Sequence, residues 1–126
     1  MNYKGEERRR YPRALFPCKI RIVTQGRLLV SHTENISRGG IRVILEENLK
    51  YFPVIGIDLM IAKNKEIQCE GRVVWVKEKV SPVDKEPIMF DTGIEFTTIS
   101  DSDKKNIECM VDTISNNKNN LEKNNK

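Results

Sequence analysis

Apolar and polar residues alternate in short runs along most of the chain, a pattern typical of half-buried β-strands. Turn-forming residues separate the runs, as at Gln25-Gly26 and at Lys63-Asn64-Lys65. About six short strands at such intervals predict a small antiparallel barrel or sandwich. The runs cover residues 18–22, 28–34, 41–45, 54–62, 67–75 and 90–96.

In the fifth run one phase is apolar and ends at Trp75, so we expect Trp75 to lie in the core or at its rim. Gly71 stands inside this run, and a glycine in mid-strand predicts a bulge or a tight bend. Residues 77–87 are expected to form a loop before the last strand. The residues that share the apolar phase are Ile67, Cys69, Val73 and Trp75.

One segment near the C-terminus has a helical pattern. Ser100 stands at a helix N-cap position, with Asp103 three residues later where a capping box requires it. We expect the apolar stripe that follows to pack against one opening of the barrel. The stripe consists of Ile107, Met110, Val111 and Ile114.

These patterns divide the chain into a flexible N-terminal arm (residues 1–8), a barrel domain with its C-terminal helix (residues 9–114) and a disordered tail (residues 115–126). The tail is mostly Asn and Lys and has almost nothing to bury. No apolar run approaches the roughly 18 residues of a membrane helix. The N-terminus also lacks the apolar stretch of a secretory signal. We therefore expect a cytoplasmic protein without a membrane span.

The three cysteines form no pair with the spacing of metal ligands. Cys18 and Cys69 fall on apolar phases of strand-like runs, and Cys109 falls in the helix-like segment. We expect all three to be buried or half-buried small hydrophobic residues in a reducing compartment. The lone His32 has no partner histidine, so the sequence predicts neither a metal nor a cofactor.

Positive charge is concentrated at the two ends of the chain. Residues 1–13 carry a net charge of +3 and residues 115–126 a net charge of +2, whereas residues 14–114 carry −1. A nucleic-acid-binding barrel more often has positive charge across one face of its body. The distribution therefore favours a compact anionic ligand over nucleic acid.

Two polar segments carry the candidate chemistry. The first, Arg8-Arg9-Arg10-Tyr11-Pro12-Arg13, supplies planar guanidinium groups suited to guanine edges and phosphate oxygens. The second, Asn35-Ile36-Ser37-Arg38-Gly39-Gly40, predicts a turn with short hydrogen-bonding side chains. In that turn Gly40 is expected to permit positive φ and close approach of a base, and Arg38 to add a phosphate contact. Together the segments predict a site for an anionic, guanine-bearing small ligand.

The order and spacing of these residues also resemble a known family. Arg9-x-x-x-Arg13 followed by Asn35-x-Ser37-x-x-Gly40 resembles the two motifs of PilZ domains, over roughly residues 8–114. Val73-Val74-Trp75 and Gly93-Ile94-Glu95-Phe96 resemble later strands of that family. The resemblance implies a mainly β protein, a six-stranded antiparallel β-barrel with one C-terminal α-helix, that binds the bacterial second messenger cyclic di-GMP (c-di-GMP). The candidate binding residues are Arg8, Arg9, Arg13, Asn35, Ser37, Arg38, Gly39 and Gly40.

The same resemblance implies a receptor rather than an enzyme, and the sequence contains no arrangement of nucleophile, base and acid. We expect ligand binding to order the arginine segment over the barrel and to signal to an unidentified protein effector. Arg8 directly precedes the first motif, which resembles the pattern in PilZ proteins that accommodate two stacked ligand molecules.

Two alternatives stay open. One is a small barrel that binds nucleic acid through its basic ends, although such barrels commonly offer more aromatic stacking residues. The other is a PilZ-like protein-interaction module that has lost the ligand. Taken singly, the first motif is typical of a solvated arm and the second of an ordinary hairpin loop.

Overall fold

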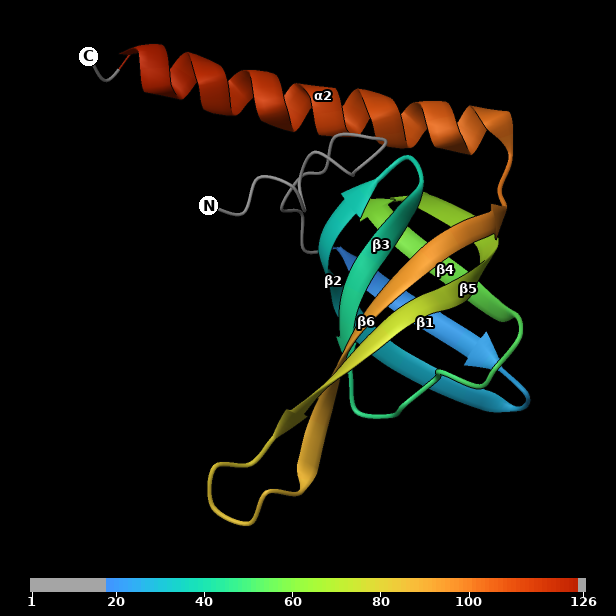
Figure 1. Ribbon diagram of the computed structural model, residues 1–126. Helices are drawn as coiled ribbons and strands as arrows, with labels where there is room; N and C mark the ends of the chain where they lie inside the picture. The colour runs from blue at the N-terminus through green and yellow to red at the C-terminus, as the bar shows by residue number, and fades with distance from the viewer. Residues whose placement is uncertain (1–17, 125–126) are drawn as a thin grey trace.

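Six antiparallel strands close into a barrel, and one helix crosses an end of it (Figure 1). The computed structural model describes the backbone of residues 18–124 and the side chains of residues 18–114. Around the barrel the strands follow the order β1-β2-β3-β6-β5-β4. The predicted six-stranded barrel with a C-terminal helix is therefore confirmed. The elements are β1 (Lys19–Thr24), β2 (Arg27–Ser37), β3 (Gly40–Leu45), β4 (Ile55–Ala62), β5 (Lys65–Val80), β6 (Pro87–Thr98) and α2 (Asp101–Asn124).

The core is built from the apolar phases of the strands, which the alternation turns toward the barrel axis. Most of its side chains are Ile, Val or Leu. The β-branched residues among them suit the pleated, half-buried surface of a strand. Leu49, in the connection between β3 and β4, is fully buried and belongs to the same cluster. Ile107 and Val111 of α2 are also buried in it, so the core extends from the barrel into the helix.

Helix α2 begins as the sequence predicts. The Ser100 hydroxyl accepts a hydrogen bond from the backbone N–H of Asp103 at 3.0 Å, which is the bond of an N-cap. Within the stripe, Ile107 and Val111 are buried, while Met110 and Ile114 are half-buried against the core. The stripe thus anchors the first half of the helix on the barrel.

β5 and β6 are longer than their apolar patterns indicate. The sequence predicts a loop over residues 77–87, but β5 continues to Val80 and β6 begins at Pro87, so the two strands form a ribbon that leaves the barrel (Figure 1). This ribbon has solvent on both faces, so its sequence does not need to alternate between apolar and polar residues. A register shift between Glu70 and Gly71 confirms the irregularity predicted at the glycine.

A second register shift, between Val73 and Trp75, moves Trp75 to the outer face of the barrel. Its indole lies over Gly93 of β6, where a Cβ atom would stand 2.2 Å from the indole Nε1. The prediction that Trp75 shares the core phase of Val73 is therefore wrong, because the extra residue of a bulge reverses the alternation.

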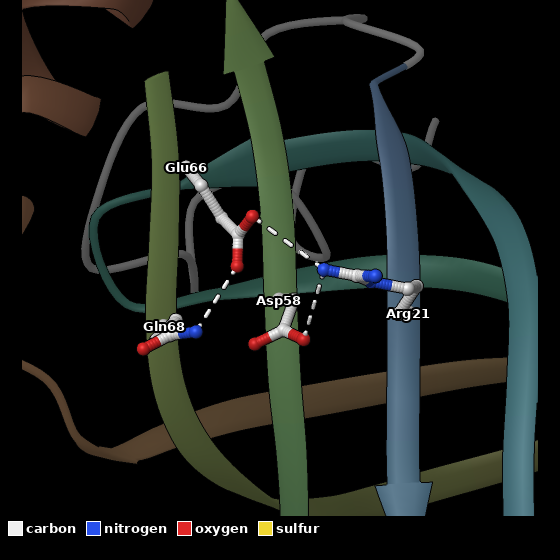
Figure 2. Close-up of polar contacts among 4 residues, drawn as sticks. All are labelled: Arg21, Asp58, Glu66 and Gln68. Carbon is white, nitrogen blue, oxygen red and sulfur yellow. Dashed lines mark hydrogen bonds and ion pairs between the residues drawn. The ribbon is translucent and has the colours of Figure 1, made fainter. Parts of the chain in front are cut away.

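Charged side chains tie three strands together on the outer surface. The Arg21 guanidinium on β1 lies 3.4 Å from a carboxylate oxygen of Asp58 on β4 and 3.5 Å from one of Glu66 on β5 (Figure 2). Gln68 donates a hydrogen bond to the other oxygen of Glu66 at 3.1 Å. All of these groups are partly exposed, so the network contributes little to stability compared with the core.

The cysteines follow the expectation at two of three positions. Cys18 and Cys69 are buried, and burial raises the pKa of both thiols, that of Cys69 to about 12. Cys109 is exposed, which corrects the prediction for that residue. It lies next to the apolar stripe of α2 in sequence but projects from the opposite side of the helix.

Helix α2 continues to Asn124, into the segment for which the sequence predicts a disordered tail. That segment has Leu121 as its one large apolar residue. We predict that deleting residues 115–126 changes the melting temperature by less than about 2 °C, because little apolar surface is available there to bury. Thermal denaturation of the shortened chain checks this, and a drop of about 5 °C or more would show that the segment packs on the domain.

Candidate functional site

The second motif forms the tight connection between β2 and β3. Asn35, Ile36 and Ser37 are the last residues of β2, and Gly40 is the first of β3, so that only Arg38 and Gly39 make the turn. The predicted six-residue turn is thus much shorter, because Ser37 pairs directly with Gly40 in the ladder. A register shift between Thr33 and Asn35 precedes it and leaves both Asn35 and Ile36 buried.

Ser37 holds this turn together from inside. Its hydroxyl accepts a hydrogen bond from the backbone N–H of Gly39 at 3.2 Å. The same hydroxyl lies 3.5 Å from the carbonyl oxygen of Gly40, to which it donates. Ser37 and Asn35 are both buried, with 3% and 7% of their surface exposed. The two short polar side chains therefore sit at a fixed place on the barrel rim.

Gly40 is required for packing and not for a left-handed conformation. Among the described residues Gly26 is the one glycine with positive φ, so the expectation of positive φ at Gly40 is wrong. A Cβ atom at Gly40 would stand 2.2 Å from the carbonyl oxygen of Ile94 on β6. The carbonyl of Gly39 also accepts a hydrogen bond from the N–H of Phe96 at 3.0 Å. Gly40 thus lets the turn lie directly on the β6 backbone.

Arg38 projects from the turn toward helix α2. Its Nη1 lies 3.3 Å from a carboxylate oxygen of Glu108, and both side chains are nearly half exposed. The turn and the helix are therefore linked by an ion pair at the barrel end that α2 crosses (Figure 1). A phosphate contact by Arg38 would have to compete with Glu108.

Arg42 is a residue that the sequence patterns did not single out. It pairs with Asn35 across β2 and β3, which places the two side chains on the same face. Its Nε and Nη2 donate to the two carboxylate oxygens of Asp91, both at 2.8 Å, and this bond raises the pKa of the guanidinium. The sequence shows that Arg42 points outward from its strand, because it alternates with apolar residues. Its position beside Asn35 depends on the pairing register of β2 and β3, which the sequence does not show.

The structure thus brings together five of the candidate binding residues: Asn35, Ser37, Arg38, Gly39 and Gly40. The other three, Arg8, Arg9 and Arg13, lie outside the described residues. No group of three or more potential metal ligands occurs among the residues that the structure describes. Within the described residues, no helix is long and apolar enough to cross a membrane.

A model of the PilZ domain family matches residues 7–113 of the sequence, which is most of the chain. The chain belongs to the PilZ family. The barrel, both motif segments and the first half of helix α2 fall within the matched region. No curated protein matches the chain at a significant level.

Several solved structures share the fold of this PilZ domain at low sequence identity. The PilZ domain of YcgR from Escherichia coli with c-di-GMP has a TM-score of 0.65 and 17% identity, over 94% of this chain and 98% of that one. MotI/DgrA, an inhibitor of motility from Bacillus subtilis, has a TM-score of 0.71 and 20% identity, over 88% and 53%. The MrkH–c-di-GMP complex of K. pneumonia has a TM-score of 0.68 and 24% identity, over 90% and 55%. The chain therefore spans about half the length of MotI/DgrA and MrkH.

Loss of the Ser37 hydroxyl is expected to loosen the turn of the PilZ domain. Ser37→Ala should lower the free energy of unfolding by about 1 kcal/mol, because the N–H of Gly39 loses its partner. Urea denaturation measures the change, and hydrogen exchange of the Gly39 amide should become faster. Ser31→Ala is the matched control, since Ser31 on the same strand donates to the Ile44 carbonyl at 2.9 Å. Unchanged exchange at Gly39 in Ser37→Ala would contradict this role.

Proposed function

We propose that this PilZ domain is a non-catalytic receptor for c-di-GMP, held between the arginine segment and the β2–β3 turn. The observation that carries the proposal is the turn itself, which buries Asn35 and Ser37 two residues apart on β2 at the barrel rim and holds Ser37 there by two hydrogen bonds within the turn. Two solved structures with the same fold, those of the YcgR PilZ domain and of MrkH, contain c-di-GMP, which supports this choice of ligand.

The chemistry of the ligand suits the residues assigned to it. c-di-GMP presents two phosphates and two guanines. Arg9 and Arg13 offer planar guanidinium groups that form paired hydrogen bonds with phosphate oxygens or with the O6 and N7 edge of guanine. Asn35 and Ser37 supply short donors and acceptors for a base edge. Arg38 and the tight glycine turn complete the set, and Arg42, whose charge is offset by Asp91, lies beside Asn35.

Binding becomes a signal if the arginine segment closes over the turn only when ligand is present. Residues 1–13 carry a net charge of +3, and the ligand phosphates offset the repulsion among the arginines. The ligand then has a higher affinity for the closed arrangement, which is the condition for a population shift. The closed segment and the ligand form a new surface for a protein effector. MotI/DgrA is named an inhibitor of motility, so motility proteins are one class of effector to test.

Calorimetric titration of the domain with c-di-GMP, GTP and a short single-stranded RNA tests the proposal. We expect c-di-GMP to bind with a Kd of roughly 1 μM, about −8 kcal/mol, and the other two to bind at least about tenfold more weakly. The RNA is included to test the alternative of a small barrel that binds nucleic acid through its basic ends. Preference for RNA would favour the nucleic-acid-binding alternative. Absence of binding to all three would favour a PilZ module without ligand.

The stoichiometry of binding depends on Arg8. Two stacked c-di-GMP molecules bring about four negative charges into one site, and an additional arginine lowers their mutual repulsion. We predict two ligands per chain for the natural sequence and one for Arg8→Leu. Calorimetry gives both numbers, with Lys4→Leu as a control for charge elsewhere in the same segment. One ligand per chain in both proteins would rule out this role for Arg8.

A further inference from the structure

The end of β5 and the start of β6 form a ribbon over residues 74–90, the β5–β6 arm. It leaves the barrel at the end away from helix α2 (Figure 1). β4 pairs with β5 only as far as Gly71, which lies opposite Ile55. Beyond that point no strand of the described residues pairs with β5 on the side away from β6. Residues 72–80 therefore have an open edge.

An open strand edge carries backbone N–H and C=O groups, on alternate residues, that are available to another extended chain. The β5–β6 arm as a whole is also rich in exposed apolar side chains. Ten large apolar residues of the described chain are exposed, and half of them lie in this arm, which is a small part of the sequence. Such a concentration on a monomer is typical of an interaction surface. The five are Val74, Trp75, Val80, Val83 and Ile88.

The two faces of the edge differ in chemistry. Trp75, Lys77 and Lys79 lie on the outer face, as their pairing with Gly93, Asp91 and Met89 shows. Asp91, which stands opposite Lys77, already accepts hydrogen bonds from Nε and Nη2 of Arg42. Neither lysine forms an ion pair within residues 18–114.

The opposite face carries Val76 and Val80 with Glu78 between them. The edge thus reads Val-Lys-Glu-Lys-Val from residue 76 to residue 80. Its best complement is a strand with valine-like residues opposite Val76 and Val80, acids opposite the two lysines, and a base opposite Glu78.

We propose that the open edge of β5 is a docking site for an extended segment of a partner protein, which adds to the sheet as an additional strand. The segment carries acidic residues on one face, opposite Lys77 and Lys79, and apolar residues at its ends opposite Val76 and Val80. This is strand addition, in which the backbone supplies affinity and the alternate side chains supply specificity. The site is separate from the β2–β3 turn and does not depend on the ligand proposed there.

Charge favours this occupant over two others. The arm has three lysines and three acidic residues, so its net charge is zero, whereas nucleic acid requires a cationic surface. A second copy of the chain, paired antiparallel about Glu78, would place Lys77 opposite Lys79 and Glu78 opposite itself. Like charges directly opposite destabilise a strand pair.

The test uses the whole chain and two capped peptides. One has the sequence Thr-Val-Glu-Lys-Glu-Val-Thr and the other, with its charges reversed, Thr-Val-Lys-Glu-Lys-Val-Thr. Trp75 is the single tryptophan of the chain, so its fluorescence reports binding at the arm. We expect the first peptide to bind about tenfold more tightly than the second, and hydrogen exchange to slow within residues 72–80.

A charge-swapped variant sharpens the result. Lys77→Glu combined with Glu78→Lys and Lys79→Glu changes three exposed side chains and should reverse the peptide preference, while binding of c-di-GMP stays as in the natural chain. Lys63→Glu with Lys65→Glu, two exposed residues where β4 turns into β5, is the control and should leave the preference unchanged. Equal binding of both peptides, or none at 1 mM, would overturn the proposal. Dimerisation through β5 would overturn it in favour of a second copy of the chain. Oligonucleotide binding that requires Lys77 and Lys79 would overturn it in favour of nucleic acid.

Discussion

Replacement of Gly40 by valine is expected to lower the free energy of unfolding by at least about 3 kcal/mol, the upper range for an overpacked site. A Cβ atom at this position would stand 2.2 Å from the carbonyl oxygen of Ile94 and 3.2 Å from Cα of Glu95. Both are backbone atoms of the neighbouring strand β6, so no side-chain rotation can relieve the contact. Strand β3 would have to separate from β6 at the rim, and the turn beside it would move.

Chemical denaturation of Gly40→Val and Gly40→Ala measures the effect, and we expect most of it already with alanine. Gly56→Ala is the matched control, because Gly56 also lies in a strand but its Cβ would be 3.4 Å from its nearest neighbour. It should be close to neutral. If Gly40→Ala were as stable as Gly56→Ala, the close packing of the turn on β6 would be wrong as the reason for this glycine.

The second large effect is expected on ligand binding. Arg9→Ala and Arg13→Ala should each weaken c-di-GMP binding by roughly 1–3 kcal/mol, which is the discrimination that a paired arginine–guanine contact provides. The double variant should show little binding at ligand concentrations near 10 μM, because a Kd of roughly 1 μM would rise about a hundredfold or more, to about 100 μM or above.

Melting temperatures separate this effect from a loss of folding. Neither variant changes a residue of the core that the structure describes, so both variants should melt like the natural chain. Arg27→Ala serves as the control for loss of an arginine, since Arg27 stands at the start of β2 and pairs with Glu47, far along the strand from Ser37. Natural affinity in both Arg9→Ala and Arg13→Ala would remove the arginine segment from the site.

The sequence predicts the barrel well because burial inside a small barrel imposes a strict alternation. The phases of β1 and β3 are read directly from residues such as Ile20, Ile22 and Val43, which are all fully buried. The N-cap at Ser100 is equally local and is confirmed by a single hydrogen bond. These features depend on residues close together in the chain.

The features that sequence patterns missed depend on pairing between distant strands. The role of Gly40 is set by the β6 backbone, and the outward position of Trp75 by a bulge that no local signal marks. The length of the β5–β6 arm was missed because a ribbon exposed on both faces has no core to impose a pattern. Arg42 became part of the site through its pairing with Asn35.

Hydrogen exchange with and without c-di-GMP tests most directly whether the ligand joins the arginine segment to the β2–β3 turn. Amides of residues 9–14 and of Ser37 to Gly40 should gain protection when ligand is added, because ordering a segment over the turn buries both. Amides of β5 from Ile67 to Val76 lie on the other side of β6 and should change little. Protection that is equal with and without ligand, or that appears in β5 and not in the turn, would contradict the account.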